Sequence, residues 1–154
     1  MIPLDQERIL RDNRRISILV EQWSNTSLVP WGLTAAQAQI LLYILRHREG
    51  GTSLTQIHRE FGYSMAALSG IIKRLREKGY VRAEFQNGDG RCKRLFPTPA
   101  ARDLQEHLDR SSAQVRQQLW RCFTPQELHD LDCLQRKLLS SLCTLTHQAK
   151  EEPS

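Results

Sequence analysis

Residues 64–96 read SMAALSGIIKRLREKGYVRAEFQNGDGRCKRLF, and two different structural patterns follow one another in this segment. Its first half carries apolar side chains three or four residues apart, which predicts a helix from Ser64 to about Lys78 that Gly79 ends. The period then changes, because residues 80–85 and 92–96 are both typical of strands. The segment between them contains Asn-Gly and Asp-Gly dipeptides, which are strong hairpin signals. The stretch therefore predicts a helix followed by a β-hairpin.

A second short helix is predicted just before this stretch. Ser53 is placed to cap it, and Leu54, Ile57 and Phe61 follow at helical spacing. Gly62 then predicts a tight turn, because glycine adopts a left-handed conformation at little cost. Two short helices joined by a tight turn and followed by a hairpin make a winged helix-turn-helix.

Longer helices are predicted on both sides of this unit. Apolar periodicity indicates helices over about residues 5–27, 35–47 and 99–122, and a last helix from residue 125. Thr34 begins a capping-box pattern with Gln37, and Thr-Pro pairs at 98–99 and 124–125 open the last two helices. Residues 25–32 are expected to form a loop, and residues 150–154 a frayed polar tail. The predicted fold class is mainly α with a small β-hairpin wing.

The positive charge of the chain is concentrated in one window. The 154 residues carry a net charge of +5. Between residues 70 and 102 we count nine basic and three acidic side chains, which leaves +6 there and −1 in the rest. This window coincides with the predicted helix and hairpin, so a nucleic-acid partner is favoured over a merely solvated charged face. The N-terminus lacks a secretory pattern and no apolar run approaches the length of a membrane span, so we expect a cytoplasmic protein with no membrane partner.

Four spaced groups of residues give the chain a resemblance to a known family. They are Gly32-Leu33-Thr34 with Gln37, the run IIKRLREKGYV at residues 71–81, Asp89-Gly90-Arg91 in the wing, and Thr98. In this order the chain resembles the MarR (multiple antibiotic resistance regulator) transcription factors from end to end. The resemblance implies a homodimeric regulator, typically a ligand-responsive repressor, that binds a pseudo-palindromic operator on double-stranded DNA. It also implies that the first and last helices intertwine between two copies.

On this basis the chain divides into four parts. We expect a dimerisation helix in residues 1–33, the winged helix-turn-helix lobe in 34–98, dimerisation helices in 99–149 and a disordered tail in 150–154. Residues 70, 83 and 101 depart from the family, which often places arginine, arginine and glycine there. The small side chains at the start of the recognition helix leave an alternative open, a winged-helix adaptor for protein contacts that no longer reads DNA.

The resemblance also assigns roles in DNA binding. Arg91 is expected to enter the minor groove while Asp89 holds its guanidinium, although a plain solvated charge pair is the alternative. Lys73 and Arg74 are expected at phosphates. Lys93 and Arg94 follow one another on a strand, whose residues alternate between faces, so only one of the two can face DNA. The full candidate set is Ser64, Met65, Ala66, Ser69, Lys73, Arg74, Asp89, Arg91, Lys93 and Arg94.

A small aromatic or phenolic effector is the remaining partner that the resemblance implies. The candidate pocket residues are Arg15, Trp23, Trp31, Gln39 and Tyr43, with plain core packing as the alternative for the three aromatic rings.

The sequence predicts no catalytic, metal or cofactor site. It contains no glycine-rich phosphate loop, no G-x-S-x-G and no C-x-x-C pair, so an enzyme has little support. The four cysteines are expected to be free thiols, and cations around Cys92 would favour its thiolate.

Overall fold

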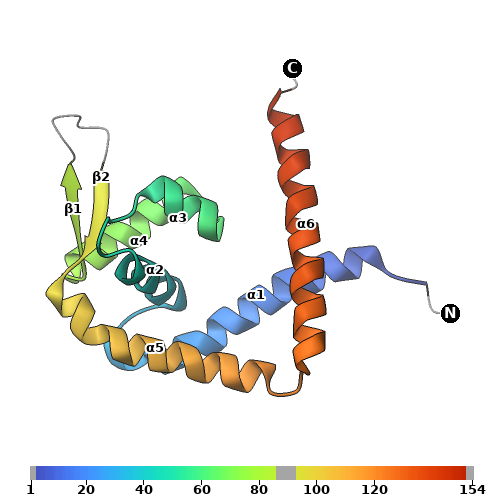
Figure 1. The fold of residues 1–154 in the computed structure, drawn as a ribbon, viewed down its shortest axis with the longest axis horizontal. Coiled ribbons are helices and arrows are strands. Elements are labelled where there is room, and N and C mark those ends of the chain that lie inside the picture. The colour runs from blue at the N-terminus through green and yellow to red at the C-terminus, as the bar shows by residue number, and fades with distance from the viewer. Residues whose placement is uncertain (1–2, 86–92, 152–154) are drawn as a thin grey trace. The chain divides into compact units, whose positions relative to one another are not determined.

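The computed structural model describes residues 3–85 and 93–151, and Figure 1 shows the arrangement of its elements. In chain order these are α1 (Gln6–Leu28), the 3-10 helix η1 (Val29–Trp31), α2 (Ala35–Arg46), α3 (Leu54–Phe61), α4 (Met65–Glu77), β1 (Val81–Phe85), β2 (Lys93–Pro97), α5 (Pro99–Trp120) and α6 (Pro125–Glu151). The chain forms two compact units, residues 1–114 and 115–154. Within the described ranges no single helix has the length and apolar character of a membrane span; only α1–η1 and α2 together, bent by 73°, pass that test.

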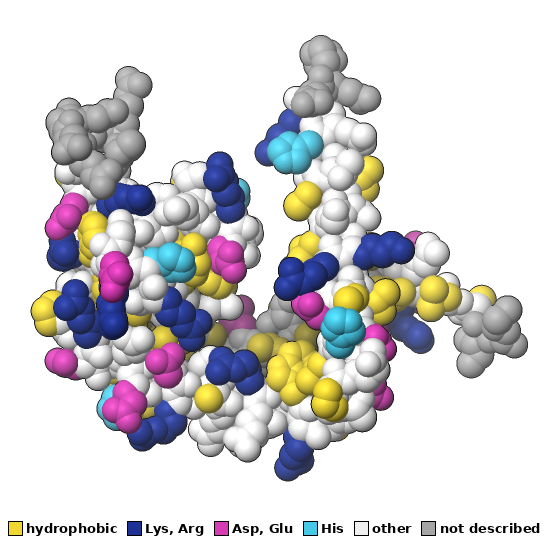
Figure 2. Space-filling model, in the orientation of Figure 1, with side chains coloured by type: hydrophobic (Ala, Val, Ile, Leu, Met, Phe, Trp, Pro, Cys, Tyr) yellow, Lys and Arg dark blue, Asp and Glu magenta, His cyan; other side chains and the backbone are white. Residues whose placement is uncertain are grey.

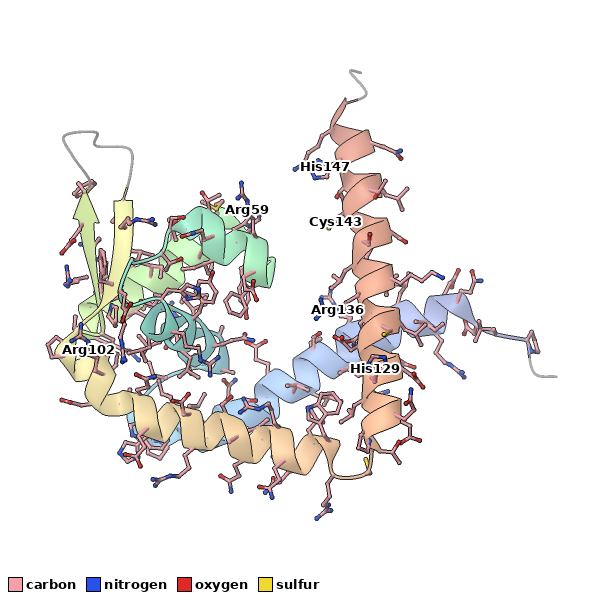
Figure 3. All side chains as sticks on the ribbon, viewed as in Figure 1. Arg59, Arg102, His129, Arg136, Cys143 and His147 are labelled. Carbon is pink, nitrogen blue, oxygen red and sulfur yellow. The ribbon has the colours of Figure 1, made fainter. Side chains whose placement is uncertain are left out.

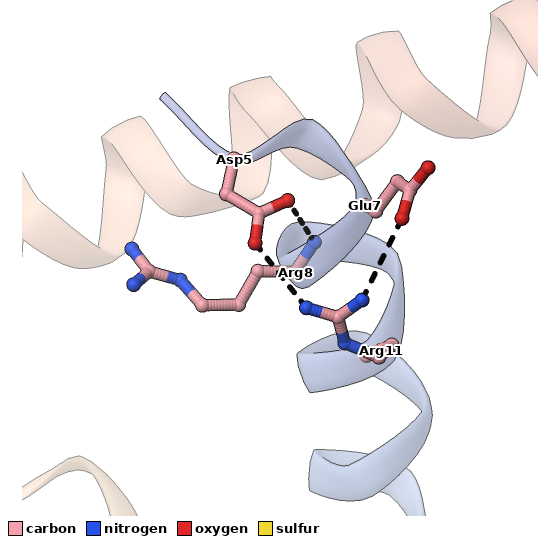
Figure 4. Close-up of polar contacts among 4 residues, drawn as sticks. All are labelled: Asp5, Glu7, Arg8 and Arg11. Atoms are coloured by element: carbon pink, nitrogen blue, oxygen red, sulfur yellow. Dashed lines mark hydrogen bonds and ion pairs between the residues drawn. The ribbon is translucent and has the colours of Figure 1, made fainter. Parts of the chain in front are cut away.

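Polar side chains hold the first turn of α1. The Asp5 carboxylate accepts a hydrogen bond from the backbone N–H of Arg8 at 3.0 Å, which caps the helix. Arg11 reaches back to Asp5 at 3.2 Å and to Glu7 at 3.7 Å (Figure 4). All three side chains are exposed, so these ion pairs order the helix end and add little stability.

Helix α2 is the centre of the first unit. Thr34 and Gln37 form the predicted capping box, with the Gln37 N–H donating to Thr34 Oγ1 at 3.2 Å. Ile40, Leu41 and Ile44 are fully buried, and α1, α4 and β2 all pack on this helix. The dense apolar pattern of residues 35–47 therefore forms the core, as expected of a helix that is apolar on most sides.

The helix-turn-helix is confirmed, with its boundaries close to those predicted. Ser53 caps α3 and Ser64 caps α4, and Gly62 between them has a φ of +75°. Leu68, Ile72 and Leu75 of α4 are buried, so one side of this helix faces the core.

The hairpin is also confirmed, and it has a third partner. Strands β1 and β2 pair antiparallel with Val81 opposite Pro97 and Phe85 opposite Lys93. Thr52, in the segment before α3, exchanges two backbone hydrogen bonds with Leu95 of β2, at 3.1 and 2.8 Å. The turn of the wing, residues 86–92, lies outside the described residues.

Helix α5 closes the first unit along its N-terminal half. Ala101, Leu104 and Leu108 are buried there. Further along, the hydroxyls of Ser27 and Ser111 lie 2.8 Å apart. These contacts bring α5 against the C-terminal part of α1.

The second unit consists of the end of α5, a short turn and α6. Thr124 caps α6 by accepting from the Glu127 N–H at 3.2 Å, and Glu127 accepts from the Thr124 N–H at 2.8 Å. The helix continues to Glu151, so residues 150 and 151 of the expected tail are helical. Large apolar side chains along α6 are exposed, among them Leu134 at 65%, Leu139 at 62% and Leu145 at 60%.

Candidate nucleic-acid interface

The outward side of α4 is built of small and cationic side chains. A helix turns about 100° per residue, so the side opposite the buried Leu68, Ile72 and Leu75 carries Ala66, Gly70, Lys73, Arg74 and Glu77. These five residues are exposed, and so is Ser69 at the edge of this side. Methyl, hydroxyl and hydrogen side groups at the N-terminal end leave the helix backbone close to the surface, and charged groups follow at the C-terminal end.

Neighbouring segments fix where α4 starts. Ser64 Oγ accepts from the Ala67 N–H at 3.1 Å, and this contact accounts for the Ser64 side chain as a helix cap. The ring nitrogen Nδ1 of His58 lies 2.6 Å from the carbonyl oxygen of Tyr63, which ties the turn to α3.

Burial raises the pKa of the Tyr63 hydroxyl above its ordinary value of 10.0, and the negative charge of Glu21 raises it further.

Three cations of α4 are available to a ligand. Lys73, Arg74 and Arg76 are exposed, and none of them makes an ion pair or side-chain hydrogen bond with another described residue. A phosphate that approached them would therefore not have to displace an existing acidic partner.

Other cations of the basic window are already engaged in the fold. The Lys78 ammonium donates to the carbonyl oxygen of Gly32. Arg82 pairs with Glu84 and lies over the Phe96 ring, with its guanidinium carbon 4.7 Å from the ring centre. The window charge counted from the sequence thus serves two purposes, and only part of it is free for a polyanion.

An open hollow of about 500 Å³ lies between α4 and β1. It is lined by Lys73, Arg76, Glu77, Val81, Arg82 and Ala83. Arg76 is therefore a further interface candidate, and its place in the basic window is the sequence signal that points to it. Arg82 lines the same hollow but is paired with Glu84.

The wing is held to the helices by Thr98. Its hydroxyl donates to the Gly79 carbonyl at 2.5 Å, and its N–H donates to the Tyr80 carbonyl at 3.0 Å. Thr98 Oγ1 also accepts from the Ala101 N–H at 3.4 Å, which is the predicted cap of α5. One residue thus joins the start of β1 to the start of α5.

The two described basic residues of β2 lie on opposite faces of the hairpin. Lys93 lies on the same face as the buried Leu95, whereas Arg94 lies on the other face, across from Glu84. The remaining predicted wing residues, Asp89 and Arg91, and the thiol of Cys92 lie outside the described residues. Exposed Met65, at 44%, stands at the N-terminal end of α4. In Figure 2, Lys and Arg side chains lie over the lobe formed by α3, α4 and the strands, interspersed with Asp and Glu.

The five effector candidates are spread over α1, η1 and α2. Trp31 is half-buried, and its ring lies 5.4 Å from that of His107 on α5. The Tyr43 ring is 4.0 Å from His47 and meets Phe61 edge-on at 5.4 Å. The Trp31 and Tyr43 rings therefore contact different residues.

The other three effector candidates lie at the surface. Trp23 is 37% exposed, and Arg15 and Gln39 are exposed as well. Neither the hollow described above nor a second one, lined by residues 45–51 and Gln105, includes any of the five.

Comparison with known proteins agrees with this architecture. Residues 31–91 match the sequence model of the MarR family. No curated protein matches the chain.

Solved structures share the fold along nearly the whole chain. A MarR protein from Peptoclostridium difficile superimposes with a TM-score of 0.83 at 19% identity, over 97% of this chain and 96% of that one. A MarR family regulator from Listeria monocytogenes, complexed with a 26mer DNA, gives 0.79 at 20% identity over 100% and 99%. The S. aureus MepR–DNA complex gives 0.74 at 21% identity over 84% and 92%.

The matched segment contains the helix-turn-helix and the first wing strand, and the fold of the relatives extends to the flanking helices. With its capped α3–α4 turn and two-stranded hairpin, this chain has the winged-helix fold of these structures, and its residues 31–91 match the MarR family.

Proposed function

We propose that this chain is a DNA-binding transcriptional regulator in which α4 is the recognition helix. The observation that carries the proposal is the outward side of α4, where small side chains at one end are followed by cations free of acidic partners among the described residues. An α-helix fits the major groove, which is about 12 Å wide. The Listeria and S. aureus relatives, which share the fold, are complexes with DNA.

The individual contacts follow from the positions along α4 and the wing. Lys73 and Arg74 bind phosphates, and Arg76 extends this surface along the hollow beside β1. Ser69 donates to a phosphate or a base edge. At the helix start, Ser64 is a cap whose hydroxyl also lies at the surface, and Met65 and Ala66 contact thymine methyl groups. On the wing, Arg91 enters the minor groove with Asp89 as its partner, and Lys93 or Arg94 contacts the backbone.

The working unit that we propose is a homodimer. Exposed apolar side chains on α1 include Ile9, Ile16 and Leu19, and those on α6 include Leu134 and Leu145. Unpartnered faces of this kind are covered by another surface in a stable protein. A second copy with two-fold symmetry supplies that surface and sets two operator half-sites about one helical turn apart.

The regulator acts as a repressor that a small aromatic or phenolic ligand releases from DNA. Trp23, Trp31 and Tyr43 offer apolar faces, and Arg15 and Gln39 offer polar partners for a ligand. Release requires that the ligand bind the DNA-incompetent form of the dimer more tightly than the competent form. Quenching of tryptophan fluorescence by a panel of phenols and aromatic carboxylates tests this step, and Tyr43→Ala should weaken it.

Selection of bound duplexes from a random DNA pool tests the function itself. We expect recovery of a two-fold symmetric site, and loss of enrichment when Lys73 and Arg74 are both changed to Ala. Recovery of no common sequence, together with unchanged retention by the double variant, would favour the protein-contact adaptor instead.

A further inference from the structure

Helix α6 carries a histidine and a cysteine whose side chains meet one turn apart. The Sγ atom of Cys133 lies 3.7 Å from Nε2 of His129, and both side chains are exposed. Neither residue has a role in the proposed DNA interface or in the apolar face of α6. A sulfur and an imidazole nitrogen are the ligands that zinc and similar borderline-soft divalent ions prefer.

The distance between these two atoms suits joint binding of one ion. A tetrahedral Zn²⁺ lies about 2.3 Å from a thiolate sulfur and about 2.05 Å from an imidazole nitrogen. With a tetrahedral angle between the two bonds, the sulfur and nitrogen are then about 3.6 Å apart. The observed 3.7 Å therefore requires only a small side-chain adjustment, and the helix backbone can stay as it is.

The neighbouring carboxylates are already engaged. Asp132 accepts from Arg136 Nε at 2.9 Å, and Asp130 accepts from the amide of Gln126 at 2.8 Å. The ion would therefore have two protein ligands and complete its coordination with water. Among the described residues no third potential ligand joins this pair.

The same pair of residue types recurs further along α6 in reverse order. Cys143 and His147 are also four residues apart, and Figure 3 labels both of them with His129 on α6. At about 100° per residue, all four side chains project within about 80° of one another. The mean direction of the leucines at positions 131, 134, 138, 142 and 145 is about 180° away from this stripe. A partner that covers the leucines would leave the histidines and cysteines open to solvent.

We propose that His129 and Cys133 form a bidentate site for a borderline-soft divalent cation such as Zn²⁺. Binding replaces the Sγ–H bond of Cys133 with a metal–sulfur bond and releases one proton to solvent, while neutral His129 donates its Nε2 lone pair. No electron is transferred. The ion links two successive turns of α6 and thereby stabilises this helix.

The test uses Co²⁺ as the probe, because a cobalt–thiolate bond gives a charge-transfer absorption that Zn²⁺ lacks. The assay protein retains Cys133 alone, with Cys92, Cys122 and Cys143 each changed to Ser, and is kept reduced under anaerobic conditions. The matched control retains Cys122 alone. Cys122 is likewise exposed, but the residues four positions away on either side are glutamines.

We expect the Cys133 protein to develop the thiolate band with one Co²⁺ per chain and to lose it when Zn²⁺ is added. His129→Ala in the same protein should weaken Co²⁺ binding at least about tenfold, because only one protein ligand remains. The inference is overturned if His129→Ala leaves the affinity unchanged or if the Cys122 protein binds equally well. It is also overturned if Co²⁺ raises the oligomeric mass of the Cys133 protein, since the ion would then bridge two chains.

Discussion

Replacing Lys73 with Ala should make DNA binding measurably less sensitive to salt. Lys73 lies on the outward side of α4, is exposed, and pairs with no acid among the described residues. Each phosphate contact contributes about 0.9 to the slope of log Kobs against log salt. Two Lys73 side chains act in the proposed dimer, so the slope should become less steep by about 1.8. At 0.15 M salt this corresponds to an affinity loss of about 30-fold, if the electrostatic part vanishes near 1 M.

Fluorescence anisotropy with a labelled selected duplex, repeated over a series of salt concentrations, gives this slope. Arg121→Ala is the matched control, because it removes one exposed positive charge from the turn between α5 and α6. Glu77→Gln should have the opposite effect, since Glu77 is a negative charge on the same side of α4. An unchanged slope for Lys73→Ala, or an equal change for Arg121→Ala, would refute the assignment of α4 to the DNA backbone.

Three further perturbations test the fold and the proposed dimer. Gly51→Ala should destabilise the protein by about 2–4 kcal/mol, measured by urea unfolding. Residue 51 has a φ of +71°, and a Cβ there would lie 2.7 Å from the Phe96 ring. A loss of stability below about 1 kcal/mol would show that the Phe96 ring moves aside without strain. Leu142→Glu should weaken the proposed dimer by about 3 kcal/mol over two copies, which is roughly 100-fold in the dissociation constant measured by sedimentation. Ser140→Glu, on the opposite side of α6, should leave this constant unchanged. Equal effects of the two variants would argue against the leucine face of α6 as the dimer interface. Burial raises the pKa of the Tyr63 hydroxyl in the folded protein. The wild type should therefore lose stability relative to Tyr63→Phe as the pH rises above about 10, the pKa of tyrosine in the unfolded chain. A difference in unfolding free energy between the two proteins that stays constant from about pH 8 to 11 would contradict this.

Local signals made most of the helices predictable from the sequence. Thr34, Ser53, Ser64 and Thr124 each cap the helix that the sequence assigned to them. A cap depends on a residue and the three that follow it, so its evidence lies within one turn of chain. The change from helical to alternating period after Gly79 identified the wing in the same way.

Long-range contacts account for what the sequence did not predict. The Lys78 ammonium reaches Gly32, and the Arg82 guanidinium lies over Phe96, so neither charge is as free as a count along the chain suggests. Sequence spacing gives the face on which a side chain starts but not the partner at its far end. Thr98 was predicted as a cap, and its second bond to the Gly79 carbonyl depends on a strand return that only the folded chain provides.

The bridge between Thr52 and Leu95 limits how the wing can move. Two backbone hydrogen bonds join β2 to the segment that follows α2, and Thr52 is fully buried. Opening this joint would leave a buried N–H and C=O without partners, at a cost of about 1–3 kcal/mol each. The base of the wing and α2 therefore move as one rigid body. In the dimeric regulator that we propose, a ligand that changes DNA affinity would then rotate each DNA-binding lobe as a whole, and the distance between the two α4 helices would set the affinity.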